Sequence, residues 1–121
     1  MAVPTARLYH GTPLNVDYTP GADVTAGDVV VQGDLVGVAP RDIAADALGA
    51  LQVVGPGAVF VFPVTAGTGT ALAAGSIVYW DDSSDVVTST ASTNAVLGKV
   101  VTATSDSDTS VYVMGVQQIT P

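Results

Sequence analysis

Short apolar stretches alternate with glycine, proline, aspartate and serine at close intervals along the chain. The apolar stretches are rich in valine and threonine, which favour strands, whereas the residues between them favour turns. This pattern is typical of a small all-β domain. It predicts strands over nine segments: Leu14–Tyr18, Asp28–Gln32, Leu35–Ala39, Leu51–Val54, Ala58–Val64, Ser76–Trp80, Val86–Ser89, Val96–Ala103 and Thr109–Val116.

Aspartate accounts for all 11 acidic residues of the chain. Its side chain accepts hydrogen bonds from nearby backbone amides, so aspartate favours turns and caps over helix interiors. We therefore expect the acids to lie between strands. Gln32-Gly33-Asp34 predicts a tight turn, and Asp81–Asp85 and Ser105–Asp108 predict longer hairpin loops.

One segment, Arg41–Leu51, has a helical pattern, because Ile43, Ala47 and Leu51 recur on one side of a helix. Gly49 interrupts the pattern, and about ten residues are marginal for a helix without support from tertiary packing. We expect at most one short helix here.

The last predicted strand is apolar on both sides, since Val111 and Val113 alternate with Tyr112, Met114 and Val116. A sheet with one solvated face alternates apolar and polar residues. This strand therefore lies in the middle of a sandwich or barrel, which is the simpler interpretation, or it presents one face to a partner.

Two segments share a glycine turn followed by a strand, Thr25–Val30 and Ala73–Val78. Two copies are too few for a solenoid. They predict two similar turn-and-strand units within one domain.

The N-terminal segment contains Pro4 and has no clear strand period, which predicts a flexible arm over residues 1–12. Residues 13–121 are expected to form a single domain, a small and compact all-β sandwich or barrel-like fold. Arg7, Leu8 and Tyr9 would let the arm order against the sheet of a partner. The alternative is a tail without a role.

Charged residues make up only 12% of the chain, about half the usual share, while hydrophobic residues reach 48% and the mean hydropathy is +0.48. This apolar surplus indicates that some surface is buried against other subunits. Tyr79 and Trp80 lie at a strand end beside an acidic loop. They serve there either as core residues or as interface anchors.

The net charge of −8 argues against nucleic acid as a partner. Binding to phosphates needs clustered cations, and the chain has only Arg7, Arg41 and Lys99, which are far apart in the sequence. No segment approaches the roughly 20 apolar residues of a membrane helix. We therefore expect neither nucleic acid nor a membrane as a partner.

Candidate catalytic groups are few. His10 is the only histidine available as a base, and turn aspartates are usually solvated alike, which does not separate an acid from a base. Asp81, Asp82 and Asp85 offer oxygen ligands without the spacing of a calcium loop, and backbone capping explains them more simply. We expect no enzymatic activity, no cofactor and no metal.

Six blocks in a fixed order carry a resemblance to a known family: Val24–Val30, Leu35–Ala39, Gly57–Pro63, Ala74–Asp81, Leu97–Val101 and Asp108–Val113. The ordered set, with Tyr-Trp-Asp after the second Ala-Gly turn, resembles the head decoration, or capsid cement, proteins of tailed phages. The resemblance runs from about Tyr9 to Val113. Some members of that family have carried a recombinase-like label, but Ala66–Thr70 has no lysine and so lacks the phosphate-binding loop of such an enzyme.

The resemblance implies a structural protein that binds the outer surface of the icosahedral phage head and the major capsid protein, and that reinforces the shell. It also implies a homotrimer, at least on the capsid, and a place in the virion after synthesis in the host cytoplasm. The candidate residues for a capsid or subunit interface are Arg7, Leu8, Tyr9, Tyr79, Trp80, Tyr112 and Met114.

Two other functions stay open. Tyr79, Trp80 and the adjacent aspartate loop would form a platform for a carbohydrate or a host surface if their rings made an exposed shelf. An acid-based hydrolase would need a pocket that holds two carboxylates with shifted pKa values.

Overall fold

The computed structural model describes residues 6–32, 35–55 and 57–115. Four predictions fall partly outside these residues. They concern the first five residues of the arm, the last two residues of the Gln32-Gly33-Asp34 turn, Val116 at the end of the last strand, and residues 33–34, 56 and 116–121 of the expected domain.

The described residues contain ten strands and no helix, so they include no helix that is long and apolar enough to cross a membrane. Each of the nine predicted strands overlaps one of the strands β2 to β10, which confirms the all-β prediction. In chain order the strands are β1 (Arg7–Gly11), β2 (Asn15–Tyr18), β3 (Val29–Gln32), β4 (Leu35–Val38), β5 (Gly49–Val53), β6 (Ala58–Pro63), β7 (Ile77–Asp81), β8 (Val86–Thr88), β9 (Ala95–Val100) and β10 (Ser110–Gly115).

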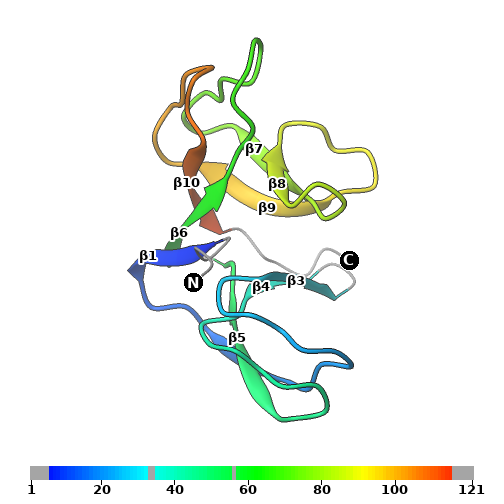
Figure 1. The fold of residues 1–121 in the computed structure, drawn as a ribbon. Coiled ribbons are helices and arrows are strands. Elements are labelled where there is room, and N and C mark those ends of the chain that lie inside the picture. The colour runs from blue at the N-terminus through cyan, green and yellow to red at the C-terminus, as the bar shows by residue number, and fades with distance from the viewer. Residues whose placement is uncertain (1–5, 33–34, 56, 116–121) are drawn as a thin grey trace.

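The strands form two antiparallel sheets, a six-stranded sheet above a four-stranded one in the view of Figure 1. The larger sheet has the order β1-β6-β10-β9-β7-β8, and the smaller has the order β2-β5-β4-β3. A parallel bridge between Val64, which follows β6, and Val87 in β8 curls the larger sheet toward a barrel. The chain therefore forms the compact single β domain that the sequence predicts.

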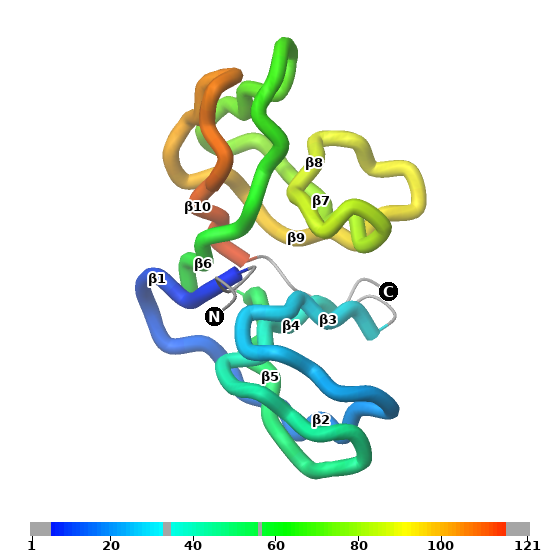
Figure 2. Tube along the Cα trace, viewed as in Figure 1, coloured from blue at the N-terminus to red at the C-terminus, as the bar shows by residue number. Residues whose placement is uncertain are grey.

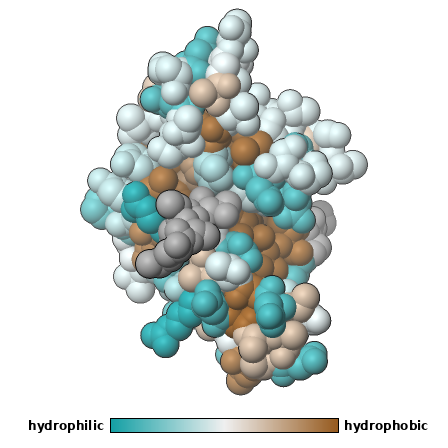
Figure 3. Space-filling view, viewed as in Figure 1, coloured by the Kyte–Doolittle hydropathy of each residue, from teal (hydrophilic) through white to brown (hydrophobic). Residues whose placement is uncertain are grey.

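One hydrophobic core serves both sheets. Phe60, Phe62 and Trp80 of the larger sheet form an aromatic row, with neighbouring ring centroids 6.0 and 5.8 Å apart. Val36 and Val38 of β4 join the same cluster from the smaller sheet. All five side chains are fully buried, so the two sheets stabilise each other through shared apolar burial. Apolar surface is also visible over β3 and β4, beside the seam between the sheets (Figure 3).

The two turn-and-strand units predicted from the sequence have matching hydrogen bonds. The N–H of Gly27 donates to the carbonyl of Ala39, and the N–H of Gly75 donates to the carbonyl of Val100, both at 2.7 Å. The two glycines have φ angles of 91° and 83°, which glycine adopts without strain. β3 and β7 therefore begin in the same way, one in each sheet.

The segment Arg41–Leu51, where the sequence allows at most one short helix, contains no helix. Ile43 pairs instead with Val24 through two backbone hydrogen bonds of 2.8 Å, and β5 begins at Gly49. Ile43 also covers Gly49 so closely that a Cβ there would lie 2.6 Å from the Cδ1 atom of Ile43. Pairing with a distant segment and close packing outweigh the marginal helix tendency of so short a stretch.

Arg7–Gly11 forms β1 at the edge of the larger sheet, within the segment where the sequence predicts an arm. The strand pairs with β6, and Leu8 lies opposite Phe60 on the core side. A bulge between Leu8 and His10 disturbs the alternation of sides, which explains why the sequence has no visible strand period here. The chain therefore joins the sheet before residue 13, where the domain was expected to begin.

Candidate functional site

The side of the six-stranded sheet that points away from the core carries two rows of side chains, and we call this side the outer face. Each row crosses neighbouring strands at paired positions. The first row is His10, Val59, Met114, Lys99 and Ile77, and the second row is Arg7, Val61, Tyr112 and Val101. Tyr9, Tyr79 and Val96 lie beside these rows on the same face.

The outer face is apolar and open to solvent. Five of the seven large apolar side chains that are exposed among the described residues lie on it, each between 41% and 49% exposed: Tyr9, Ile77, Val96, Val101 and Met114. Single exposed apolar residues are ordinary on a soluble protein, but a contiguous group of them marks an interaction surface. The outer face is therefore the candidate functional site.

Stacked aromatic rings order one end of the outer face. The rings of Tyr9 and Tyr112 lie 4.5 Å apart at an angle of 11°, and the ring of His10 lies 4.2 Å from that of Tyr9. The bulge in β1 brings Tyr9 and His10 to the same side of the sheet, which a regular strand would not do. Three rings from β1 and β10 thus form a preorganised contact surface.

The structure brings together five of the seven residues that the sequence suggests for an interface. Arg7, Tyr9, Tyr79, Tyr112 and Met114 all lie on the outer face.

The other two point the opposite way. Leu8 packs against the core, and Trp80 is 1% exposed within it. Trp80 is therefore a core residue, which was the simpler interpretation. The alternative that Trp80 serves as an interface anchor is wrong. The reason is the strict alternation along β7, which turns Trp80 inward and its neighbour Tyr79 outward.

Sequence reasoning missed several members of the outer face, chiefly Lys99, Ile77 and Val101. Ile77 lies two residues before Tyr79 in a predicted strand, so a period of two along that strand would have placed both on one side. The sides of β9 could not be assigned in this way, because a register shift interrupts its pairing with β7 between Val78 and Tyr79.

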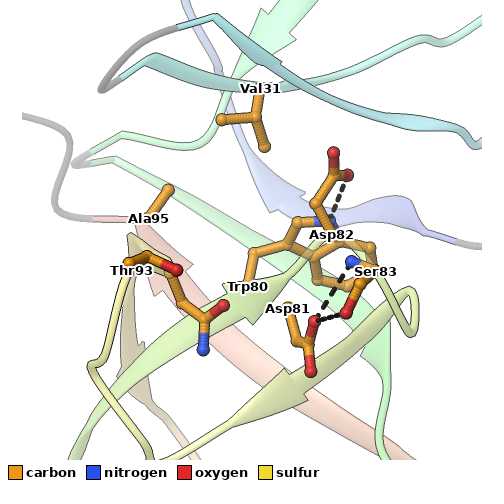
Figure 4. Close-up of a pocket in the computed structure, with 8 residues that line it drawn as sticks. Val31, Trp80, Asp81, Asp82, Ser83, Thr93 and Ala95 are labelled. Carbon is orange, nitrogen blue, oxygen red and sulfur yellow. Dashed lines mark hydrogen bonds between the residues drawn. The ribbon is translucent and has the colours of Figure 1, made fainter.

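A pocket of about 280 Å³ opens where β3 of the smaller sheet meets β7 and the chain before β9 (Figure 4). The indole Nε1 of Trp80 donates a hydrogen bond of 3.2 Å to Oδ1 of Asp82 at its rim. The hydroxyl of Ser83 donates to Oδ1 of Asp81 at 2.6 Å, and this bond lowers the pKa of the Asp81 carboxyl from its ordinary value. The aspartates here fix the loop after β7.

The pocket does not support the hydrolase hypothesis. A carboxyl that acts as a general acid near neutral pH needs a raised pKa, and the pKa of Asp81 moves the other way. The described residues also contain no group of three or more histidines or aspartates placed to hold a metal ion.

The carbohydrate platform is not formed either. It would need Tyr79 and Trp80 side by side on the surface, but they lie on opposite sides of β7 and Trp80 is buried. The hypothesis required an exposed shelf made of both rings, and the structure does not have one.

Comparison with known proteins gives one family. The model of the phage cement protein family matches residues 9–115, which include every residue of the outer face except Arg7. Comparison with curated proteins and with solved structures gives no match.

Proposed function

The chain belongs to the phage cement protein family, and we propose that it binds the outer surface of an icosahedral phage head and stabilises the shell. The proposed partner is the major capsid protein, and the proposed assembly is a homotrimer, at least on the capsid. The protein is made in the host cytoplasm and becomes part of the virion. Its role is structural, without enzymatic activity, cofactor, nucleic acid or membrane.

The outer face is the observation that carries this proposal. It gathers exposed tyrosine, methionine and arginine on a protein of net charge −8. Tyrosine, methionine and arginine are enriched at protein interfaces, where acidic residues are depleted. A surface of this composition suits a protein partner better than a sugar or a phosphate backbone.

Cementing requires binding alone. A protein that binds the assembled shell, and not its separated subunits, stabilises the assembled state by a free energy that grows with the ratio of its concentration to its dissociation constant. Each contact can be weak, because a shell presents many identical sites and linked copies bind with a high effective concentration. The compact β domain supplies a rigid body that loses little conformational entropy on binding.

Co-sedimentation with undecorated capsids tests the proposal. We expect the purified protein to sediment with the capsids in near-physiological salt and to raise the temperature at which they disassemble. Trp80→Asp, which places a charge in the core, gives an unfolded control for nonspecific adhesion. Absence of both effects with the folded protein would exclude the proposed function.

A further inference from the structure

Two of the three basic residues of the chain lie on a different surface from a group of four of its 11 acidic residues. Of its three basic residues, Arg7 and Lys99 lie on the outer face, and none of the nine residues in the two rows is acidic. The two rows thus form a positively charged, apolar surface on a strongly acidic protein, and the one acidic residue on the same side of β7, Asp81, lies at the end of that strand. Charge complementarity favours a partner surface that is acidic and carries apolar residues of its own.

A surface of that kind exists on the other side of the same chain. Residues 20–28 and 40–48 run side by side next to the smaller sheet (Figure 2), joined by the bridge between Val24 and Ile43. We call these two segments the acidic loop pair. They contain four acidic residues and one basic residue, namely Asp23, Asp28, Asp42, Asp46 and Arg41.

Hydrogen bonds between the two segments hold the acidic loop pair in place. Oδ1 of Asp23 accepts the N–H of Ala45, and Oδ1 of Asp42 accepts the N–H of Ala26, each at 2.8 Å. Leu48, at the end of the second segment, is 72% exposed. The loop pair therefore presents carboxylates and one large apolar side chain on a preorganised backbone.

We propose that the outer face of one copy binds the acidic loop pair of a second copy in a head-to-tail contact. Arg7 and Lys99 face the aspartates of the loops, and Leu48 packs against the apolar row. Two outer faces placed against each other would bring cations together, whereas the head-to-tail contact pairs opposite charges. Such contacts repeat from copy to copy and close into a ring when the rotation between copies allows it.

The size of the outer face sets the strength of this contact. Neighbouring strands lie about 4.8 Å apart and alternate residues about 6.8 Å apart, so the two rows cover on the order of 300 Å². A stable interface usually buries about 800 Å² on each partner. The contact is therefore weak between free chains and is strengthened where copies are held close together. The inference rests on the oligomeric part of the proposed function, because it assigns the outer face to the contact between subunits. A closed ring would then bind the capsid through another surface, and the contact stands whether or not the chain binds capsids.

Two variants separate the two ends of the contact. The face variant carries Lys99→Glu and Met114→Thr, and the loop variant carries Leu48→Lys and Asp46→Asn. All four side chains are exposed. Asparagine also tolerates the φ of 64° at residue 46. Leu14→Lys, which replaces another exposed leucine outside both surfaces, is the matched control. Circular dichroism and thermal melting establish that each variant is folded.

Sedimentation equilibrium in low salt at about 1 mM chain measures the association. We expect the wild type and Leu14→Lys to associate, and each surface variant alone to lose at least about tenfold in association constant. An equal mixture of the two surface variants should form dimers that do not grow. The face variant keeps an intact loop pair and the loop variant keeps an intact outer face, so one contact forms between them and no further copy can add. Added salt weakens the association of the wild type.

Several results would overturn the head-to-tail contact. A loop variant that associates like the wild type would indicate face-to-face pairing. A face variant that does so would show that the outer face takes no part. A mixture that stays monomeric, or a wild type that is monomeric at this concentration, would also exclude the contact. Failure to bind capsids in the separate co-sedimentation experiment would overturn the proposed function only.

Discussion

The two sides of β10 are similarly apolar, yet they have different surroundings. Val111 and Val113 are buried in the core, whereas Met114 is exposed and Tyr112 is stacked on Tyr9 at the surface. The smaller sheet covers only the first side. The hydrophobicity of a strand therefore shows which of its sides can be buried. The arrangement of the two sheets decides which of those sides is buried within the folded chain. The other side is left uncovered by the smaller sheet.

The largest expected effect on stability comes from comparing two neighbouring residues of β7 that lie on opposite sides of the sheet. Trp80→Ala removes a fully buried ring and lowers the free energy of unfolding by about 3–5 kcal/mol. Tyr79→Ala acts on the outer side and costs about 1 kcal/mol or less. Urea denaturation followed by circular dichroism measures both. Equal losses would contradict the assignment of the two sides.

A smaller effect is expected where the backbone beneath the outer face is tightly packed. A Cβ at Gly98 would lie 2.1 Å from the carbonyl oxygen of Met114, so Gly98→Ala forces β9 and β10 apart. We expect a loss of about 1–3 kcal/mol in the free energy of unfolding. Gly21→Ala is the control, because a Cβ there has no neighbour within 4 Å. If the two variants were equally stable, the close approach of the strands would be disproved.

The tyrosine stack tests whether the outer face is ordered without a partner. Tyr9→Ala removes the ring contact with Tyr112 and lowers the free energy of unfolding by about 1 kcal/mol. It also weakens the near-ultraviolet circular dichroism signal of the tyrosines. Tyr9→Phe keeps the ring and should leave stability nearly unchanged. A full signal in Tyr9→Ala would mean that the stack does not exist in solution.

The smallest expected effect concerns Asp81, where the outer side of β7 ends. Its pKa is lowered in the folded state from 3.8, chiefly by the hydroxyl of Ser83, so its ionised form stabilises the fold. This stabilisation is complete above the ordinary pKa and is lost as the pH falls through the folded-state pKa. Asp81→Asn should therefore differ from the wild type more at pH 6 than at pH 2 in urea midpoints. A difference that grows toward acidic pH would mean that folding raises the pKa of Asp81 instead of lowering it.

Much of the fold is predictable from local sequence. The strands follow valine-rich stretches, and the aspartates between them act as expected. Asp28 and Asp108 accept hydrogen bonds from the backbone N–H groups of Thr25 and Ser105, each three residues earlier, both at 2.9 Å. Such turns depend on residues three positions apart, and short-range patterns capture them.

Two features of the fold depend on long-range contacts that a local sequence pattern does not contain. The segment around Ile43 looks helical until Val24 pairs with it, and β1 looks like an arm until a bulge and the edge of β6 are known. Neither partner is visible in a window of ten residues.

The candidate site was predictable only in part, because it too depends on contacts between distant segments. The double apolar pattern of β10 selects Tyr112 and Met114, which lie on the outer face, and their contact with a partner stays a prediction. Trp80 was ambiguous because composition alone does not show the side of a strand that faces the core. Lys99 joins the outer face only through its pairing with Met114 and Ile77, which is a property of sheet order.

The edges of the two sheets have a consequence for crowding. The edge strands β1, β8, β2 and β3 are only five, three, four and four residues long. β1 is also bulged, and the middle residue of β8, Val87, is bridged to Val64. Long, regular edges act as templates on which chains add strand by strand into fibrils, and short or irregular ones do not. Copies of this protein can therefore be packed densely, touching through side chains, without their backbones joining into aggregates.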